Sequence, residues 1–164
     1  MDSMHELFVT LLKDVHSAET QLLEALPRMA EEAGSDELKN AFEKHLEETR
    51  EQVQRLERIL KDVGEKADGE PCEAMQGLVE EAEEIIDEAD DDDVRDAGLI
   101  ASAQAVEHYE IARYGTLEAW AKELGLTKAH DLLDETLAEE KHADKLLNDL
   151  ALQRVNRMAT SASS

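Results

Sequence analysis

The apolar residues of this chain recur at a helical spacing over four long segments, and this pattern constrains the fold more than any other feature. Within residues 2–32, apolar side chains return every three or four positions, whereas a strand would alternate apolar and polar residues. The same spacing is found in residues 36–63, 92–124 and 127–156, and in a shorter segment at 73–88. The composition agrees, since aromatic residues make up only 3% and the chain has two prolines. The sequence therefore predicts an all-α protein.

Glycines mark the ends of three of these segments. Gly34, Gly64 and Gly125 follow the first, second and fourth segments, and glycine commonly follows the last turn of a helix. Two short turns would then join the long helices into two antiparallel hairpins, and the loop and short helix between them would form a long crossover. We therefore expect a ferritin-like four-helix bundle with a short extra helix in the crossover, as one domain over residues 1–157, followed by a flexible tail over 158–164.

The charge of the chain excludes some classes of partner. It has 41 acidic and 17 basic residues, a formal net charge of −24, with no local basic stripe, so nucleic acid and anionic membrane surfaces are not expected to bind. Such an acidic surface is typical of proteins that work in high salt, where the repulsion is screened. A single cysteine, Cys72, and the lack of a long apolar run favour a cytoplasmic protein.

Three glutamates lie where the helices should present apolar side chains. On a helical wheel, the apolar residues of the first helix centre within about 30° of Glu19. Those of the fourth helix centre almost on Glu110, and Glu107 is only about 60° away. A carboxylate buried alone costs several kcal/mol, so converging carboxylates need a shared cation or shared protons. A metal ion is the simplest solution.

The other two long helices offer further oxygen and nitrogen ligands. HLEETREQ in the second helix places His45, Glu48 and Gln52 on one flank of its apolar face. In TLAEEKHAD of the fifth helix, Glu140 is closest to the apolar face. The same test gives less support to two more side chains of this motif as ligands. Glu139 lies at the border of the apolar face, and His142 points away from it.

A weak internal repeat connects the two hairpins. A shift of 91 residues, from 19 to 110, also places Glu48 on Glu139. Di-iron bundles use one Glu from each of two helices and a Glu-x-x-His pair from each of the other two. Glu139 and His142 have that spacing, whereas Glu48 is followed by Glu51, which the wheel places outside. The predicted ligands are therefore Glu19, Glu48, Glu107, Glu110 and Glu140, and the competing set includes His45, Glu139 and His142.

Several longer stretches resemble the YciF/YciE-type stress-associated proteins of the ferritin-like superfamily. They include FEKHLEETREQVQRLERI, VRDAGLIASAQAVEHYEIARYGTLEAWAKELG and LLDETLAEEKHADKLL, and the resemblance runs from residue 4 to about 157. It implies a rubrerythrin-like bundle, a homodimer and a dinuclear metal site. It implies no particular reaction.

Two functions follow from these observations. The first is a stress-response protein that binds two Fe or Mn ions and handles oxygen, peroxide or iron, because oxygen-rich ligands suit these metals. Such a protein could act as a di-iron oxidase or peroxidase, and Tyr114 faces the site better than Tyr109. The alternative is a non-catalytic dimeric interaction module whose carboxylates are protonated or hold a structural ion. The chain has no four-cysteine rubredoxin-like segment to supply electrons, which weakens a peroxidase interpretation.

Overall fold

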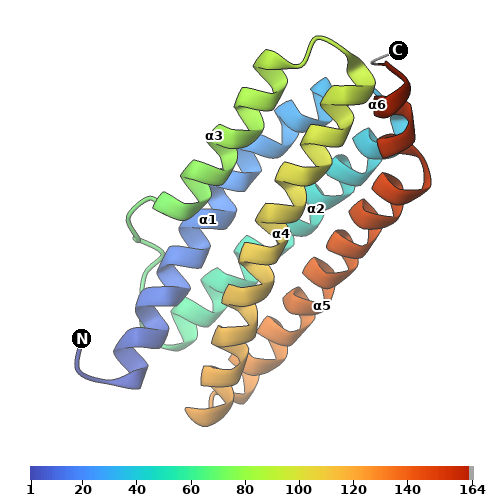
Figure 1. Cartoon of the computed structure of the whole chain (residues 1–164). Coiled ribbons are helices and arrows are strands. Elements are labelled where there is room, and N and C mark those ends of the chain that lie inside the picture. Colours follow the sequence, from blue (N-terminus) through green and yellow to red (C-terminus); the bar gives the residue numbers. More distant parts are fainter. Residues whose placement is uncertain (163–164) are drawn as a thin grey trace.

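Four long helices and a shorter one build the structure, a computed structural model that describes residues 1–162 (Figure 1). The long helices are α1 (Met4–Glu32), α2 (Asp36–Asp62), α4 (Asp92–Glu123) and α5 (Thr127–Leu150), and α3 (Glu73–Glu88) lies in the crossover. The pairs α1–α2 and α4–α5 form antiparallel hairpins, and α3 packs on α1 and α4. The predicted all-α, ferritin-like bundle is confirmed, and helix bounds differ from the expected ones by one or two residues for the first four helices.

The turns show why the glycines are where they are. Gly64 and Gly125 have φ angles of 80° and 70°, the left-handed conformation that glycine adopts without a steric penalty. Gly34 serves a different purpose. A Cβ atom there would lie 2.9 Å from the Cβ of Asp92, so the small residue lets the α1–α2 turn approach the start of α4.

Asp96 fixes this approach of the two hairpins. Its side chain is buried, and its two oxygens accept the backbone N–H groups of Gly34 at 2.6 Å and Ser35 at 2.9 Å. The Ser35 hydroxyl in turn caps α2 by accepting the N–H of Leu38. A carboxylate that accepts two turn amides satisfies donors that would otherwise be buried and unpaired. This links the turn of one hairpin to the first helix of the other.

A layer of polar residues divides the apolar core into two parts. The upper core, near α3 and the C-terminus in Figure 1, includes Leu22, Leu26, Phe42, Leu99 and Leu147. The lower core, toward the α4–α5 turn, includes Phe8, Leu12, Leu60, Leu117 and Leu133. Between them lie the charged side chains that the helical wheel placed inside the bundle.

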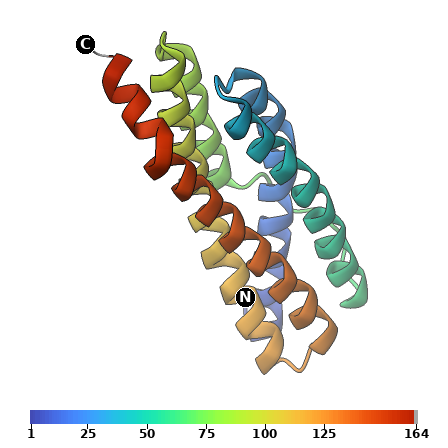
Figure 2. The same ribbon diagram turned by 90° about the vertical axis from the view of Figure 1, so that its right-hand side faces the viewer.

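The fifth helix continues further than expected. After α5 it passes through a π-helical turn, Ala151–Val155, into α6 (Asn156–Ala162), which packs on α4 (Figure 2). The first five residues of the predicted tail are therefore helical, and residues 163–164 lie outside the described part of the chain. Within residues 1–162, none of the helices combines the length and the apolar character that a membrane crossing requires.

Candidate metal centre

Five ionisable side chains meet in the middle of the bundle, and we call them the buried cluster. Glu19 comes from α1, His45 from α2, Glu107 and Glu110 from α4, and Glu140 from α5. None is more than 6% exposed. In the last four, one ligand atom from each residue lies within 4.8 Å of all the others, a separation that one cation could span.

Most polar atoms of the cluster are buried without a hydrogen bond. Among the described residues, both oxygens of Glu110 and one oxygen each of Glu19, Glu107 and Glu140 have no hydrogen-bond partner. His45 Nε2 lies 3.2 Å from a Glu107 oxygen, but without hydrogen-bond geometry. Buried polar groups in native proteins are nearly always paired, so this concentration of unpaired ligand atoms points to a missing partner.

A tyrosine supports the α1 side of the cluster. Tyr114, fully buried on α4, donates its hydroxyl to Glu19 at 2.5 Å. The bond orients that carboxylate, and its second oxygen has no hydrogen-bond partner from residues 1–162. Tyr109, the neighbour of Glu110 in sequence, instead contacts Cys72 and Asp14.

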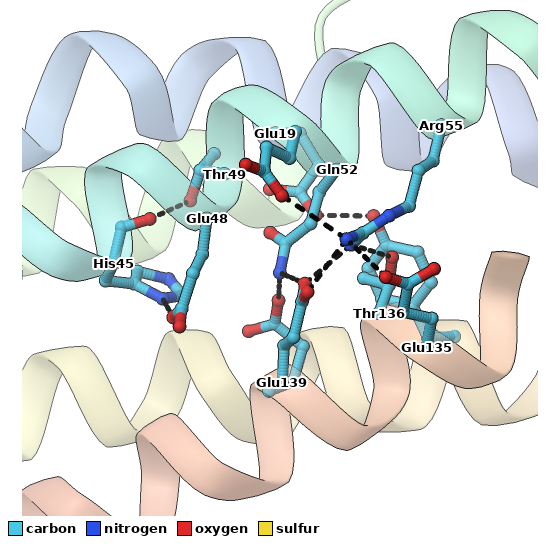
Figure 3. Close-up of polar contacts among 12 residues, drawn as sticks. Glu19, His45, Glu48, Thr49, Gln52, Arg55, Glu135, Thr136 and Glu139 are labelled. Atoms are coloured by element: carbon cyan, nitrogen blue, oxygen red, sulfur yellow. Dashed lines mark hydrogen bonds and ion pairs between the residues drawn. The ribbon is translucent and has the colours of Figure 1, made fainter.

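The α2–α5 side of the cluster is held by an amide and a guanidinium (Figure 3). Gln52, itself fully buried, donates to Glu140 and, at 3.0 Å, to Glu139. Arg55 binds Glu139 with both of its terminal nitrogens, at 2.6 and 2.8 Å, and also reaches Glu135 at 3.0 Å. A bidentate pair of this kind is geometrically specific. It turns Glu139 away from the cluster, and Gln52 fixes the neighbouring carboxylate.

Two other predicted ligands stand at the edge of the cluster or outside it. Glu48 is partly exposed, pairs with Lys44 at 3.2 Å, and lies 3.9 Å from His45 Nδ1. The nearby His45 is the main cause that lowers the pKa of Glu48, although the two side chains lie beyond hydrogen-bond distance. Burial lowers the pKa of His45, but the surrounding carboxylates, Glu48 first, outweigh this and raise it overall. His142 is exposed on α5.

Burial and mutual repulsion disfavour ionisation of three carboxyl groups of the cluster, those of Glu19, Glu107 and Glu110. Burial raises the pKa of Glu19 to about 8, and the charge of Glu140 adds to this effect, while the Tyr114 hydroxyl opposes it. Burial also raises the pKa values of Glu107 and Glu110 well above the usual range, again with help from neighbouring carboxylates. Without a cation, the cluster therefore holds protons at neutral pH.

The donor set fits a divalent metal. Four carboxylates and one imidazole converge, and most of their polar atoms have no hydrogen-bond partner among the described residues. The raised pKa values of Glu19, Glu107 and Glu110 are those of acids that lack a compensating positive charge. Carboxylate ligands suit hard divalent cations, and imidazole suits several transition metals. The residues present could therefore hold a metal ion.

Sequence reasoning underestimated two residues of α2. It placed His45 in the competing set and named Gln52 only as a flank residue, whereas both are buried at the cluster. It did not consider Arg55 at all. One signal was available, since Arg55 lies seven residues before the end of α2, three after Gln52, and hence beside it on the same helical face.

Comparison with known proteins agrees with the fold and adds a family. The chain is 47% identical over 160 residues to protein YciF of Escherichia coli K12, covering 97% of this chain and 96% of that protein. The crystal structure of the E. coli stress protein YciF superposes with a TM-score of 0.91, covering 95% of this chain and 99% of the other. YcfI from Rhodopseudomonas palustris, 46% identical, gives 0.87, with coverage of 90% and 94%.

A more distant structure shows the same fold. A two-domain protein from Anabaena variabilis, with a DJ-1/ThiJ/PfpI-like and a ferritin-like domain, matches 94% of this chain and 38% of its own length, with 21% identity and a TM-score of 0.62. The family model described as "Domain of unknown function (DUF892)" matches residues 3–160. The chain therefore belongs to this family.

Proposed function

We propose that this protein is a stress-response protein whose buried cluster binds two iron or manganese ions and exposes them to a small oxidant. The single observation that carries the proposal is the set of unpaired ligand atoms at the bundle centre, which lack hydrogen-bond partners anywhere in residues 1–162. The relation to a protein described as the stress protein YciF supports the physiological context. We further propose that the protein works as a homodimer in the cytoplasm.

The residues of the buried cluster would act as the metal ligands. Glu107, Glu110, Glu140 and His45 would hold one ion together, and Glu19 would help to hold a second. Bound iron or manganese would supply Lewis acidity and one-electron chemistry. The protein itself buries the site between the upper and lower cores.

The supporting residues fix the ligands before a metal binds. Tyr114 orients Glu19 by its hydrogen bond, and Gln52 orients Glu140. Such contacts around a metal site set the direction and basicity of the ligands. Arg55 keeps Glu139 outside, so its carboxylate pairs with a guanidinium already in place and is not required as a ligand.

Metal analysis tests this function. We expect about two ions per chain, the number that a dinuclear site requires, after purification from iron- or manganese-replete cells. The double variant Glu19→Ala, Glu110→Ala should lose them. A matched control, Glu81→Ala with Glu123→Ala, removes the same charge from exposed positions and should keep the metal.

The opposite result supports a different function. If the wild-type protein is free of metal after such growth, and the Glu19, Glu110 double variant is more stable than the wild type, the carboxyl groups are held by protons. The bundle would then act as a non-catalytic dimeric interaction module.

A further inference from the structure

A narrow pocket enters the bundle and ends at the buried cluster. All four long helices line it, and His45 and Glu107 are its two cluster residues. The residues that α1 and α4 contribute are all buried, whereas Lys44 of α2 and His142 of α5 are exposed. The pocket therefore opens to solvent between α2 and α5 and has the cluster at its inner end.

The walls of the pocket are almost entirely carbon. Between its mouth and the cluster it is lined by residues of the upper core, including Leu22, Phe42, Val106 and Leu147, and by the buried Ala143 of α5. A polar molecule such as hydrogen peroxide would have to give up hydrogen bonds to water without replacing them along these walls, at a cost of about 1–3 kcal/mol for each polar group. An apolar molecule has no such cost.

The size of the pocket limits what can enter. Its cavity volume is about 20 Å³. On the same scale a single water molecule needs about 10–15 Å³. A diatomic molecule fits this space, whereas a metabolite with a carbon skeleton does not fit without moving the helices.

The mouth of the pocket also favours a neutral molecule. Lys44 and Glu48, both among the lining residues, form an ion pair of 3.2 Å, so they present no net charge. The chain as a whole carries a formal net charge of −24, which repels anions from every approach. Anionic oxidants are therefore disfavoured at the entrance.

We propose that this pocket is the entry route for dioxygen and that it delivers the gas to the His45–Glu107 edge of the metal centre. The use of the gas at a metal rests on the function proposed above. Its binding in the pocket does not, because the walls and the mouth belong to the protein alone. The pocket thus selects dioxygen over peroxide, the two oxidants that the ligand set by itself leaves open.

Dissolved dioxygen is itself the probe for the first test, because it is paramagnetic and speeds the relaxation of nearby nuclei. The full-length, metal-free protein is studied by NMR at pH 5.5, where protonated carboxyl groups favour folding. Under oxygen pressure, the methyl groups of Leu22 and Leu147 should relax severalfold faster than those of Leu12 and Leu117, which are equally buried in the lower core. Equal enhancement in the two cores would overturn the proposal.

Two substitutions test the route in opposite directions. Ala143→Val should fill the pocket and abolish the extra relaxation, whereas Ala129→Val, at a similarly buried site of the lower core, should leave it unchanged. Leu146→Ala should widen the pocket and increase the effect, and it remains informative if Ala143→Val fails to fold.

The same variants, loaded with ferrous iron, show whether the route is used. At equal iron content, Ala143→Val should slow the reaction with dissolved oxygen severalfold in stopped-flow measurements, and Leu146→Ala should speed it. Unchanged rates in both variants would show that dioxygen enters elsewhere. A protein that binds no iron would refute the metal function and leave the relaxation result standing.

Discussion

Replacing Glu19 by glutamine should stabilise the metal-free protein strongly in alkaline solution and only slightly in mild acid. Glu19 is fully buried, and its pKa in the folded protein is about 8, against 4.5 as the ordinary value. The folded state thus binds the proton more tightly than the unfolded state does. The stabilising effect of this bound proton is complete below pH 4.5 and is lost as the pH rises toward 8. Glutamine has the same shape and cannot ionise.

The magnitude follows from these two values. They differ by about 3.5, and a difference of 1 in pKa corresponds to about 1.4 kcal/mol, so the penalty removed at pH 9 is about 5 kcal/mol. At pH 5, only slightly above the ordinary value, it is about 1 kcal/mol. The hydrogen bond from Tyr114 is retained, because an amide oxygen also accepts the phenolic proton.

Urea unfolding followed by circular dichroism, with a chelator present, measures the change in the free energy of unfolding at pH 5 and at pH 9. The control Glu24→Gln removes the same charge from an exposed position of α1 and should change the free energy of unfolding by less than about 0.5 kcal/mol at either pH. A gain from Glu19→Gln that is equal at pH 5 and pH 9 would refute the reasoning, because the effect would then not come from ionisation. A loss of stability in Glu19→Gln at both pH values would also refute it.

The other predictions concern the scaffold, and urea unfolding at pH 7 checks each of them. Arg55→Met should cost about 1–3 kcal/mol because it removes both guanidinium donors of the partly buried Glu139 and leaves it only the amide of Gln52, whereas Arg50→Met, at an exposed ion pair, should cost less than about 1 kcal/mol. Equal losses in the two variants would show that the bidentate Arg55–Glu139 pair adds nothing to stability beyond an exposed ion pair. Gly98→Ala should destabilise by about 1–3 kcal/mol, since its Cβ would lie 2.5 Å from a side-chain carbon of α3. Gly115→Ala meets nothing within 4 Å and should stabilise α4 by about 0.5–1 kcal/mol, so that a loss there would contradict the packing described.

The fold could be predicted because its information is local. Apolar spacing and helix-ending residues predicted the first four helices to within two residues of their observed bounds and the start of the fifth, and short turns indicated the two hairpins. The contact of Asp96 with Gly34 and Ser35 could not be predicted, since it joins residues about sixty positions apart. The π-helical turn Ala151–Val155 likewise depends on how the chain end packs against α4.

A site residue could be predicted where the apolar pattern of its own helix shows that it points inward. The wheel indicates that Glu19 and Glu110 point inward because each lies near the centre of its own apolar face. His45 and Gln52 lie on a flank of α2, and only the packing of α5 against that flank buries them. Glu139 lies at the border of the apolar face of α5, so the sequence of that helix does not show which way it points. The hydrogen bonds from Arg55 determine its direction.

The polar layer between the upper and lower cores also affects how long the chain would survive. Each apolar core excludes water regardless of conditions, but the middle of the bundle closes at a low free-energy cost only when protons or a cation neutralise its carboxylates. A ligand that binds only the folded state lowers the population of opened molecules by mass action. Proteases cleave opened molecules, so the metal binding proposed above predicts faster degradation at neutral pH where the metal is scarce. The abundance of the protein would then follow the supply of its ion without any change in synthesis.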